Sequence, residues 1–555
     1  MPSPAGRHAD LAPLAAEFWA WRAVTQPASG DDIPRIERPA GWTPDWSPET
    51  VDRQRKQLEA FTARWEDLFS DAQAWPVDQQ VDLRLIGSAL ARVHWELDVV
   101  QGWRRNPHFY VHQTLGPVFE ALLQPPPFGA ARVEELVRRA ESIPATLDAA
   151  RANLVGHAVR PFAQLAIGAL DDIGPRLHTV ARELTPLLEP SQARDFHQAM
   201  QRAGTDLEHF REWLFEGAPR MADAPTAIGR AAYVDFLRRV ALVPLSPEAI
   251  AAAGQQEFER AVAFEALEQQ RNRHLPPLAL RATQADQIAR EAAGEQQLRE
   301  FCEQHALLSF PTWLGHYRNL PLPAYLAPLR GLGVTDDLTS ATRLDDNGSC
   351  YIPEPRADLP YFYLAMARDS RTLIAHEGVH YYQLARAWAH ANPIRRHYYD
   401  SGPNEGIGFY AEEMLLQAGL FDDSPRSREI IYNFMRLRAV RVAVDVRLAV
   451  GELTIESAAA ELATRVPMDT ATAREEAASF ASAPGQAITY QVGKLQILRF
   501  LADARLALGA RFNLRAFHDA LWTNGNVPIA LQRWEALGLT DEVALLDTAS
   551  SRLPT

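Results

Sequence analysis

The stretch LIAHEGVHYYQLARAW, residues 373–388, decides how the rest of this chain is interpreted. It contains His376 and His380 in a H-E-x-x-H string, with Glu377 after the first histidine. Histidines four residues apart share one face of a helix, so both imidazoles can bind a single metal ion. The glutamate is then held near the water that the metal activates, where it can act as a general base. The string therefore predicts two metal ligands and one catalytic base.

The alternative is that this string arises by chance. The chain has 16 histidines, and a H-E-x-x-H string is expected on the order of 0.03 times in a sequence of this length. The flanking residues favour a helix, because residues 369–390 contain no proline and Asp369 or Ser370 can cap the first turn. We therefore interpret the string as a metal-binding helix.

A catalytic zinc site needs a third protein ligand and leaves one position open. The candidate is Glu405, which lies in residues 401–419 downstream of the motif. We expect Asn404 to cap the helix that begins there, and Glu412 and Tyr410 to lie close enough to support a ligand. The alternative is an ordinary first-turn glutamate that the helix dipole favours. After H-E-x-x-H we favour the metal ligand.

Residues 430–454 are predicted to form a long helix that carries charged residues among valines. Arg441 and Asp445 are one turn apart in it, and Arg438 is interpreted as an adjacent surface residue. The first two form either a surface ion pair or a buried pair with a function, since buried charges are usually paired or functional. Arg441 is therefore a candidate to bind a carboxylate of the substrate.

A second candidate segment is residues 482–500, where Tyr490 and Lys494 are four residues apart and Arg499 follows. A tyrosine can donate a hydrogen bond to a developing oxyanion, and lysine or arginine can bind a carboxylate. We therefore expect Tyr490 to be catalytic and Lys494 or Arg499 to bind substrate. The alternative for Tyr490 is a core aromatic residue.

The composition is that of an ordinary globular protein, with 47% hydrophobic and 23% charged residues in 555. A net charge of −14 argues against nucleic acid and anionic lipid as partners. No apolar run approaches the ~18 residues of a membrane span, and the N-terminus is unlike a signal peptide. Cys302 and Cys350 are too few for a disulfide framework. We therefore expect a cytoplasmic protein with free thiols and no membrane or nucleic-acid partner.

Helical periodicity dominates the chain, for example in residues 133–155 and 247–273. Residues 357–366 are the best strand candidate. The fold class predicted is mainly α, with a small β element near the active site. We expect an N-terminal helical region, residues 1–240, to roof a cleft over a metal-binding region, residues 241–555.

Six stretches resemble a known family: DIPRIERPAGWTPDWSPETV (32–51), NPHFYVHQTLGPVFEALLQPPPFG (106–129), LIAHEGVHYYQL (373–384), NEGIGFYAEE (404–413), APGQAITYQVGKLQIL (483–498) and NLRAFHDALWTNGNVP (513–528). With these residues the chain is similar, nearly end to end, to the bacterial DUF885 proteins, which are placed among the zincin-like metallopeptidases. The family's E-G-x-x-x-Y-x-E and Y-x-x-G-K strings fall on Glu405, Gly406, Tyr410, Glu412, Tyr490, Gly493 and Lys494. The resemblance implies a multi-helix, gluzincin-type fold, a metal held by His376, His380 and Glu405, and hydrolase chemistry.

The chain also departs from the family pattern at three places. The Pro-Gly pair that many members carry within the H-E-x-x-P-G-H form is absent. Ala449 stands where many members have a histidine, and Ser479-Phe480 stands where many have Arg-Tyr. The three metal ligands are retained, whereas some groups expected to touch the substrate are not.

The function predicted is zinc-dependent hydrolysis of an amide bond in a small peptide or peptide-like substrate. One Zn²⁺ per chain, or another divalent metal, would activate water for this reaction. One alternative is a specialised small-molecule metallohydrolase or lyase, which the missing histidine and arginine favour. Another is a non-catalytic helical scaffold that retains the motif. The oligomeric state is left open.

Overall fold

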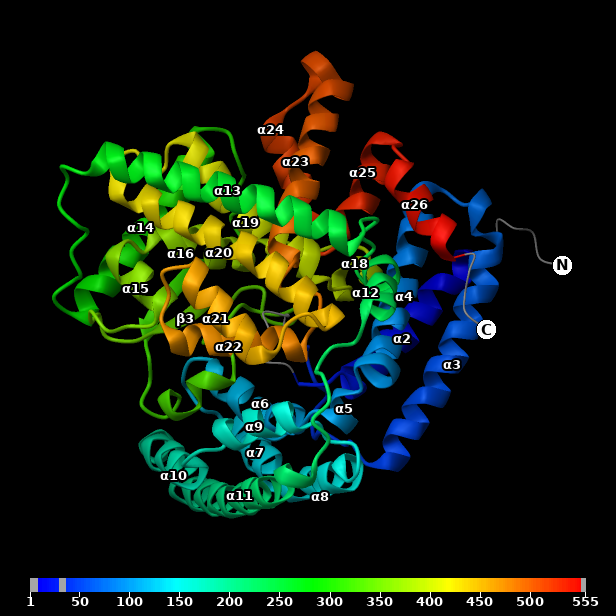
Figure 1. Cartoon of the computed structure of the whole chain (residues 1–555), viewed down its shortest axis with the longest axis vertical. Helices are drawn as coiled ribbons and strands as arrows, with labels where there is room; N and C mark the ends of the chain where they lie inside the picture. The colour runs from blue at the N-terminus through cyan, green and yellow to red at the C-terminus, as the bar shows by residue number, and fades with distance from the viewer. Residues whose placement is uncertain (1–7, 29–35, 551–555) are drawn as a thin grey trace.

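Helices dominate the computed structural model of the chain, which describes residues 8–28 and 36–550 (Figure 1). One small sheet accompanies them. The prediction of a mainly α-helical fold with a small β element is therefore confirmed. Residues 32–35, which begin the first stretch of the family resemblance, lie outside the described residues. Within the described ranges, no helix is both long and apolar enough to cross a membrane.

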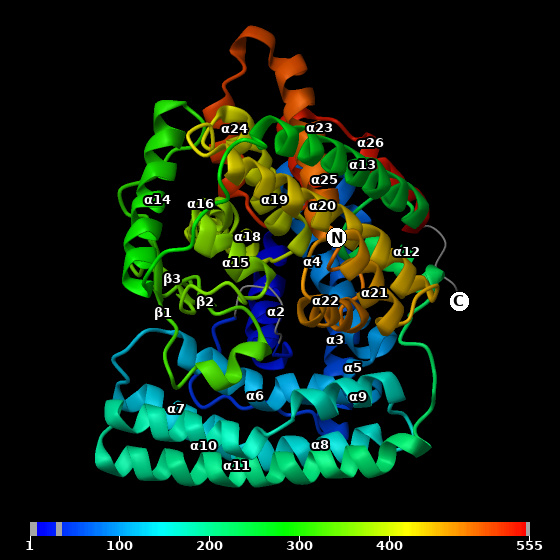
Figure 2. The same cartoon turned by 60° about the vertical axis from the view of Figure 1, so that its left-hand side comes forward.

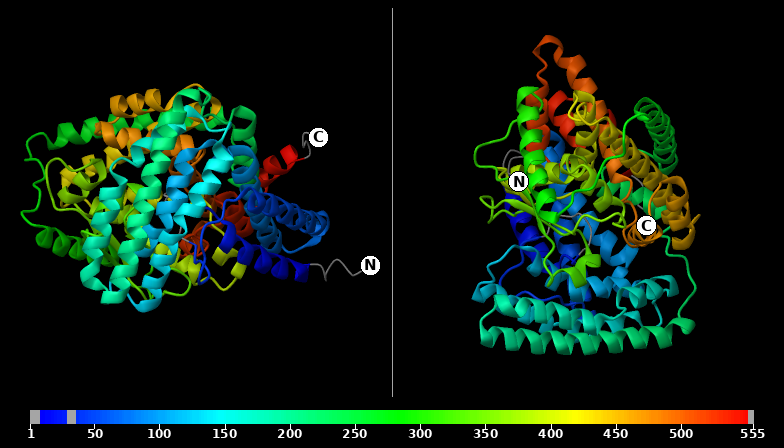
Figure 3. Two further views of the ribbon diagram at one scale, coloured as in Figure 1. Left: turned by 90° about the horizontal axis from the view of Figure 1, so that it is seen from below. Right: turned by 90° about the vertical axis from the view of Figure 1, so that its left-hand side faces the viewer.

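The N-terminal helices form two groups, of which α7 to α11 make a layer on one side of the molecule (Figures 2 and 3). Apolar residues spaced by three or four, such as Val133, Leu136 and Ala140 of α7, are buried in a core that both groups share. The helices of this part are α2 (Leu11–Thr25), α3 (Pro48–Asp71), α4 (Val77–His94), α5 (Gly102–Arg105), α6 (Pro107–Leu123), α7 (Ala130–Glu141), α8 (Ile143–Leu154), α9 (Arg160–Ala169), α10 (Ile173–Leu184), α11 (Pro190–Gly217) and α12 (Arg230–Asp235).

The C-terminal part surrounds the H-E-x-x-H segment with long helices, of which α13 packs along α20 and α19 along α23 (Figure 1). The helices of this part are α13 (Pro247–Asn272), α14 (Gln284–Gln304), α15 (Tyr361–Arg368), α16 (Arg371–Leu373), α17 (Val379–Trp388), α18 (Pro393–His397), α19 (Ser401–Ala418), α20 (Pro425–Val450), α21 (Ile455–Arg465), α22 (Thr470–Ser482), α23 (Thr489–Leu508), α24 (Leu514–Thr523), α25 (Ile529–Leu537) and α26 (Asp541–Ser550). The helices predicted for 247–273 and 430–454 are thus present as α13 and α20.

The sheet has the strands β1 (Tyr317–Pro321), β2 (Asp336–Asp337) and β3 (Gly348–Ile352), in the order β1-β3-β2. β1 and β3 are parallel and pair Tyr317 with Gly348, whereas β2 is antiparallel to β3 and pairs Asp336 with Cys350. Cys350 and Cys302 are both buried, free thiols, as predicted. The sheet therefore brings Asp336 to the interior near the metal-binding helix.

The strand predicted for residues 357–366 is wrong, because most of this segment forms α15. Its aromatic residues have a high β propensity, but tertiary packing overrides such a preference. Tyr361 and Phe362 pack against Phe434 of α20, with both ring centroids 5.8 Å from the Phe434 ring. Helical geometry also buries Ala365 and Met366, one turn further along α15.

One apolar core joins the two regions predicted from the sequence. The cluster that contains the N-terminal helices also includes Tyr325, Leu329, Ile394 and Trp534 from beyond residue 240. Apolar burial of this kind stabilises a fold by roughly 25 cal/mol per Å². The two regions are therefore packed together, and a domain boundary near residue 240 stays a prediction.

Candidate metal centre

The H-E-x-x-H string lies in a helix that changes its winding at the motif. A π-helical segment, Ile374–Gly378, connects α16 to α17 and contains His376, while His380 lies in α17. Single π turns of this kind occur frequently at functional sites. Of the two caps predicted, Ser370 occupies the N-cap position of α16 without a side-chain bond, and the preceding Asp369 carboxylate accepts a hydrogen bond from the Arg371 backbone N–H at 3.1 Å.

Glu405 comes from α19, which begins earlier than the sequence predicted. The helix starts at Ser401, where the Asp400 carboxylate accepts a hydrogen bond from Gly402 N at 2.8 Å. The prediction of Asn404 as the cap is therefore wrong. Asn404 is buried instead, and its amide donates to the Gln383 side chain on α17. Glu405 consequently lies in the second turn, where the α19–α17 contact directs it toward the histidines.

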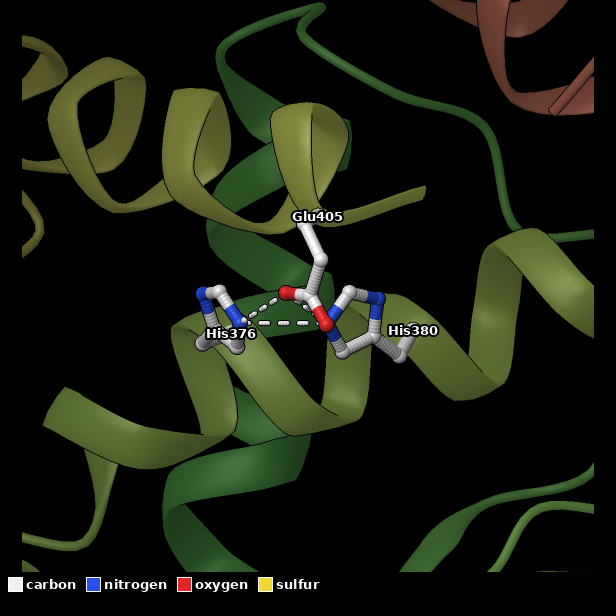
Figure 4. A group of neighbouring side chains, drawn as sticks. All are labelled: His376, His380 and Glu405. Atoms are coloured by element: carbon white, nitrogen blue, oxygen red, sulfur yellow. Dashed lines mark hydrogen bonds and ion pairs between the residues drawn. The ribbon is translucent and has the colours of Figure 1, made fainter. Parts of the chain in front are cut away.

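The three predicted ligands converge on one point (Figure 4). The Nε2 atoms of His376 and His380 lie 3.1 Å apart, and each lies 3.2 Å from Glu405 Oε2. Tetrahedral ligands with bonds of 2.0–2.1 Å around zinc are about 3.3 Å from one another. Among the described residues no other group of three histidine, cysteine or carboxylate side chains converges in this way. The geometry therefore fits a small divalent metal ion.

Two glycines allow α19 to approach this closely. A Cβ atom on Gly408 would lie 2.8 Å from His376 Cε1 and 2.9 Å from His380 Cε1, so a larger residue would push α19 away from both imidazoles. A Cβ on Gly406 would lie 2.6 Å from the Gly493 Cα atom of α23. Gly406 and Gly493 of the two family strings, together with Gly408, thus serve the contacts that bring α17, α19 and α23 together.

The far side of His376 is closed by Glu412 and Arg438. His376 Nδ1 lies 2.8 Å from Glu412 Oε1, and Arg438 Nη2 lies 3.0 Å from the same oxygen. These are close contacts and not hydrogen bonds to the carboxylate, because both Glu412 oxygens are buried without a hydrogen-bond partner among the described residues. A carboxylate placed behind a metal-binding imidazole is nevertheless the arrangement of carboxylate–histidine–metal triads. Burial, with a smaller effect of Arg438, lowers the pKa of His376 to about 3. The imidazole is therefore neutral and able to bind metal.

The sequence prediction placed Arg438 on the surface, which is wrong. It is buried, and its guanidinium lies 5.2–5.6 Å from the rings of Phe409, Phe434 and Tyr490. The apolar residues around Arg441 in the same helix were the available signal that this stretch is buried. Burial raises the pKa of Glu412 to about 7, and the Arg438 charge opposes that effect.

Tyr490 and Arg441 lie next to this group. The Tyr490 ring stacks on His376, with ring centroids 5.9 Å apart and 19° between the planes. The Arg441 guanidinium lies 4.6 Å from the Tyr490 ring and binds both carboxylate oxygens of Glu476 at 2.6 Å. Arg441 does not pair with Asp445, whose carboxylate accepts hydrogen bonds from the backbone of Gly485 and Ala487 and from Tyr233.

Lys494 and Arg499 are not brought to the metal ligands. Lys494 is buried, and its ammonium donates to Glu257 and Glu413 at 2.9 Å each. Arg499 is half exposed and pairs with Asp541 and Glu542 of α26. Nine residues separate Arg499 from Tyr490, which is about 13 Å along a helix. Lys494 therefore has a packing role between α13, α19 and α23, and Arg499 belongs to the surface.

Glu377 faces a cavity of about 480 Å³ beside the metal ligands. His380 and Leu384 line the same cavity from the motif helix, and Asp336 lines it from β2. The opposite wall comes from α6, α7 and the segment around Arg38. Within the motif string, Glu377 is half-buried, whereas His376 and His380 are buried. The predicted base is thus placed where a substrate would reach it.

The chain belongs to the family described as "Bacterial protein of unknown function (DUF885)", which it matches over residues 32–534. This confirms the resemblance found in the sequence. No match is found among curated proteins.

Two solved structures share the fold. One is described as "a putative lipoprotein of unknown function from Shewanella oneidensis", with 16% identity and a TM-score of 0.68 over 96% of this chain and 99% of that one. The other is described as "the putative lipoprotein from Colwellia psychrerythraea", with 16% identity and a TM-score of 0.69 over 99% and 100% of the two chains. At this identity the likeness extends to the fold alone.

The prediction of a cytoplasmic protein is contradicted by these comparisons. Both similar structures are described as lipoproteins, which are membrane-anchored or secreted. The free thiols on which the prediction rested do not report the compartment, because Cys302 and Cys350 are buried. Burial raises the pKa of Cys302 to about 12 and that of Cys350 well above its usual value. Both remain inert thiols in reducing or oxidising surroundings.

Proposed function

We propose that this protein is a zinc-dependent hydrolase that cleaves an amide bond in a small peptide or peptide-like molecule. The convergence of His376, His380 and Glu405 within 3.2 Å, with Glu377 beside them on a cavity, carries the proposal. An H-E-x-x-H helix followed by a glutamate from a second helix is the gluzincin arrangement. The proposal therefore includes a gluzincin-type fold for this chain.

The chemistry assigned to the chain begins at Glu377. Its carboxylate takes a proton from the attacking water and delivers it to the amide nitrogen as the carbon–nitrogen bond breaks. A bound Zn²⁺ would supply Lewis-acid chemistry, by lowering the pKa of water and polarising the carbonyl. Tyr490 is the proposed hydrogen-bond donor to the carbonyl oxygen, which is supported by the position of its ring against His376.

The cavity supports a small substrate. A volume of about 480 Å³ is in the range of pockets that take small molecules, roughly 300–1,000 Å³. The packed layer that includes α7 forms one wall of this cavity. A short peptide or an acylated amino acid is of the required size.

A second candidate is a specialised metallohydrolase of small polar molecules other than peptides. The departures from the family pattern favour it. Ala449 is buried in an apolar cluster with Trp95 and Tyr233, so the position that carries a histidine in many members is filled by packing here. Half of the residues that line the cavity beside Glu377 are Arg, Asp or Glu. Comparing turnover of a dipeptide library with that of a panel of polar amides separates the two candidates.

The test of the mechanism is Glu377→Gln. Glutamine preserves the shape of the side chain but cannot accept the proton, so turnover should fall by about 10²–10⁴-fold while metal content and substrate affinity stay near normal. Glu413→Gln, a buried carboxylate on α19 that pairs with Lys494, is the matched control. A Glu377→Gln variant that turns over substrate within a few-fold of the parent would reject the mechanism, even with metal present.

A further inference from the structure

The cavity beside Glu377 has a wall of charged side chains from distant parts of the chain. Arg38 precedes α3, Glu120 belongs to α6 and Arg139 to α7, while Asp337 belongs to β2 and Arg343 follows that strand. Any molecule that places an amide bond at Glu377 must also contact this wall, because the cavity is only about 480 Å³. The charges that remain unpaired on the wall therefore select the substrate.

Most of the wall charges are neutralised within the protein. Arg343 donates to both oxygens of Asp337, at 2.7 and 2.9 Å. Arg139 pairs with Glu135 at 3.2 Å. Asp336 accepts a hydrogen bond from a tyrosine of β1. These groups have partners already and gain little from an additional charge.

Arg38 differs from these side chains. Among the described residues it forms no ion pair, and its Nη atoms donate to the backbone carbonyls of Ala23 at 3.0 Å and Pro27 at 3.5 Å. Its Nε atom is buried without a hydrogen-bond partner in the described part of the chain. Trp42 lies under its guanidinium, 4.1 Å from the ring centroid, and holds it in place.

Both signs of charge act on Arg38. Burial is the largest cause that lowers its pKa to about 10; the charge of Glu120 raises the pKa, and the smaller effects of Arg22 and Arg139 lower it. Glu120 also lines the wall, but among the described residues no ion pair joins it to Arg38. A half-buried guanidinium with an unpartnered Nε atom and no ion pair can still bind an anion that enters the cavity.

Arg132 lines the same cavity and also lacks a carboxylate partner among the described residues, but it has a different role. Its guanidinium donates to the carbonyls of Ala121 and Pro125, both at 3.0 Å, and of Gln124. These bonds close the C-terminal end of α6 and use most of its donors. Arg132 is thus a structural residue, and Arg38 remains as the group available to a ligand.

We infer that the cavity takes substrates that carry a carboxylate, and that Arg38 binds this carboxylate while the amide bond lies at Glu377. The inference rests on the proposed function for the reacting bond and adds the class of substrate. A planar guanidinium matches the two oxygens of a carboxylate, which makes arginine a selective anchor for it. This assignment replaces Arg441, Lys494 and Arg499, whose charges are paired elsewhere.

The test compares charged and neutral probes that are otherwise alike. The probes are the dipeptide Ala–Glu, Ala–Gln, and the C-terminal amide of each. Their equilibrium binding is measured by calorimetry on zinc-loaded protein that carries Glu377→Gln. This protein is compared with variants that carry Glu377→Gln together with Arg38→Met, Arg38→Lys or Arg343→Met. Arg343 is the matched control, because it lines the same cavity but is already paired with Asp337.

We expect the Glu377→Gln protein with Arg38 intact to bind at least one carboxylate-bearing probe tenfold or more tightly than the matching amide probe. Arg38→Met should abolish this preference and leave the neutral probes unchanged, Arg38→Lys should retain part of it, and Arg343→Met should retain all of it. Equal binding of charged and neutral probes, a preference that survives Arg38→Met, or no binding of any probe would overturn the inference. Hydrolysis that depends on Glu377 but shows no charge preference would reject the role of Arg38 and leave the proposed function intact. A charge preference without hydrolysis would reject the proposed function and leave the role of Arg38 intact.

Discussion

The two sides of the His376–His380–Glu405 group are built differently. On the inner side, Glu412 and Arg438 form a buried chain of contacts behind His376, at 2.8 and 3.0 Å. On the outer side, Glu377 faces a cavity whose wall includes an arginine without a paired carboxylate. The inner side is closed, and its carboxylate and guanidinium lie against each other, so it positions His376. The outer side leaves charge uncompensated, so it is suited to receive a substrate.

Tyr490→Phe tests whether the tyrosine that stacks on His376 takes part in the reaction. If the hydroxyl stabilises the carbonyl oxygen, kcat should fall by about 10²–10³-fold with little change in KM, as for other single oxyanion donors. Steady-state kinetics on the parent and the variant provide the measurement. A kcat near that of the parent would return Tyr490 to the role of a core aromatic residue packed on His376.

Glu291→Gln tests the rule that a buried carboxylate needs a cation, because Glu291 has none among the described residues. Its side chain is buried, the one hydrogen bond that the described part of the chain gives it comes from Gln287 at 2.9 Å, and burial raises its pKa to about 7. A raised folded-state pKa means that the contribution of Glu291 to stability is full below about pH 4.5 and is lost as the pH rises through 7.

The Gln variant lacks this titration, so it should be more stable than the parent above pH 7, by up to about 3 kcal/mol, and similar near pH 4.5. Denaturant unfolding at several pH values gives the comparison. A constant difference between the two proteins across this range would show that Glu291 does not titrate between pH 4.5 and 7.

Glu412→Gln and Arg438→Met sharpen the account of the inner side. Each removes one member of the chain behind His376, so zinc affinity should fall by about 10–100-fold, as for other residues that orient a metal ligand. Arg441→Met is the control, since Arg441 pairs with Glu476 and does not contact His376. Competition with a chelator measures the affinities. Equal effects of Arg438→Met and Arg441→Met would reduce Arg438 to a packing residue.

The sequence predicted the inner ligands well because their pattern is local. His376 and His380 lie four residues apart, and a helix is sufficient to place both imidazoles on one side. Glu405 followed from the requirement for a third ligand and from the family string. Their convergence agrees with that expectation to within the distances that zinc ligands show.

The substrate-binding candidates could not be predicted in the same way, because their partners come from remote segments. Arg441, Lys494 and Arg499 were predicted as groups that bind a substrate carboxylate, yet Glu476, Glu257 and Asp541 pair with them from other helices. Arg38 gave no signal, since only the fold reveals that it lines a cavity without a carboxylate partner. Likewise, Asn404 was expected to cap α19, but Asp400 caps the helix at Ser401 and Asn404 instead donates to Gln383 on α17.

The most direct test of the central claim is the zinc content of the purified chain and of two matched variants on α19. Glu405→Ala removes a proposed ligand, whereas Glu413→Ala removes a buried carboxylate that pairs with Lys494 and Arg260. Elemental analysis should find about one zinc, or an equivalent divalent ion, per chain in the parent and in Glu413→Ala, and little in Glu405→Ala. Full occupancy in folded Glu405→Ala, or a parent that binds no divalent metal at all, would contradict the account.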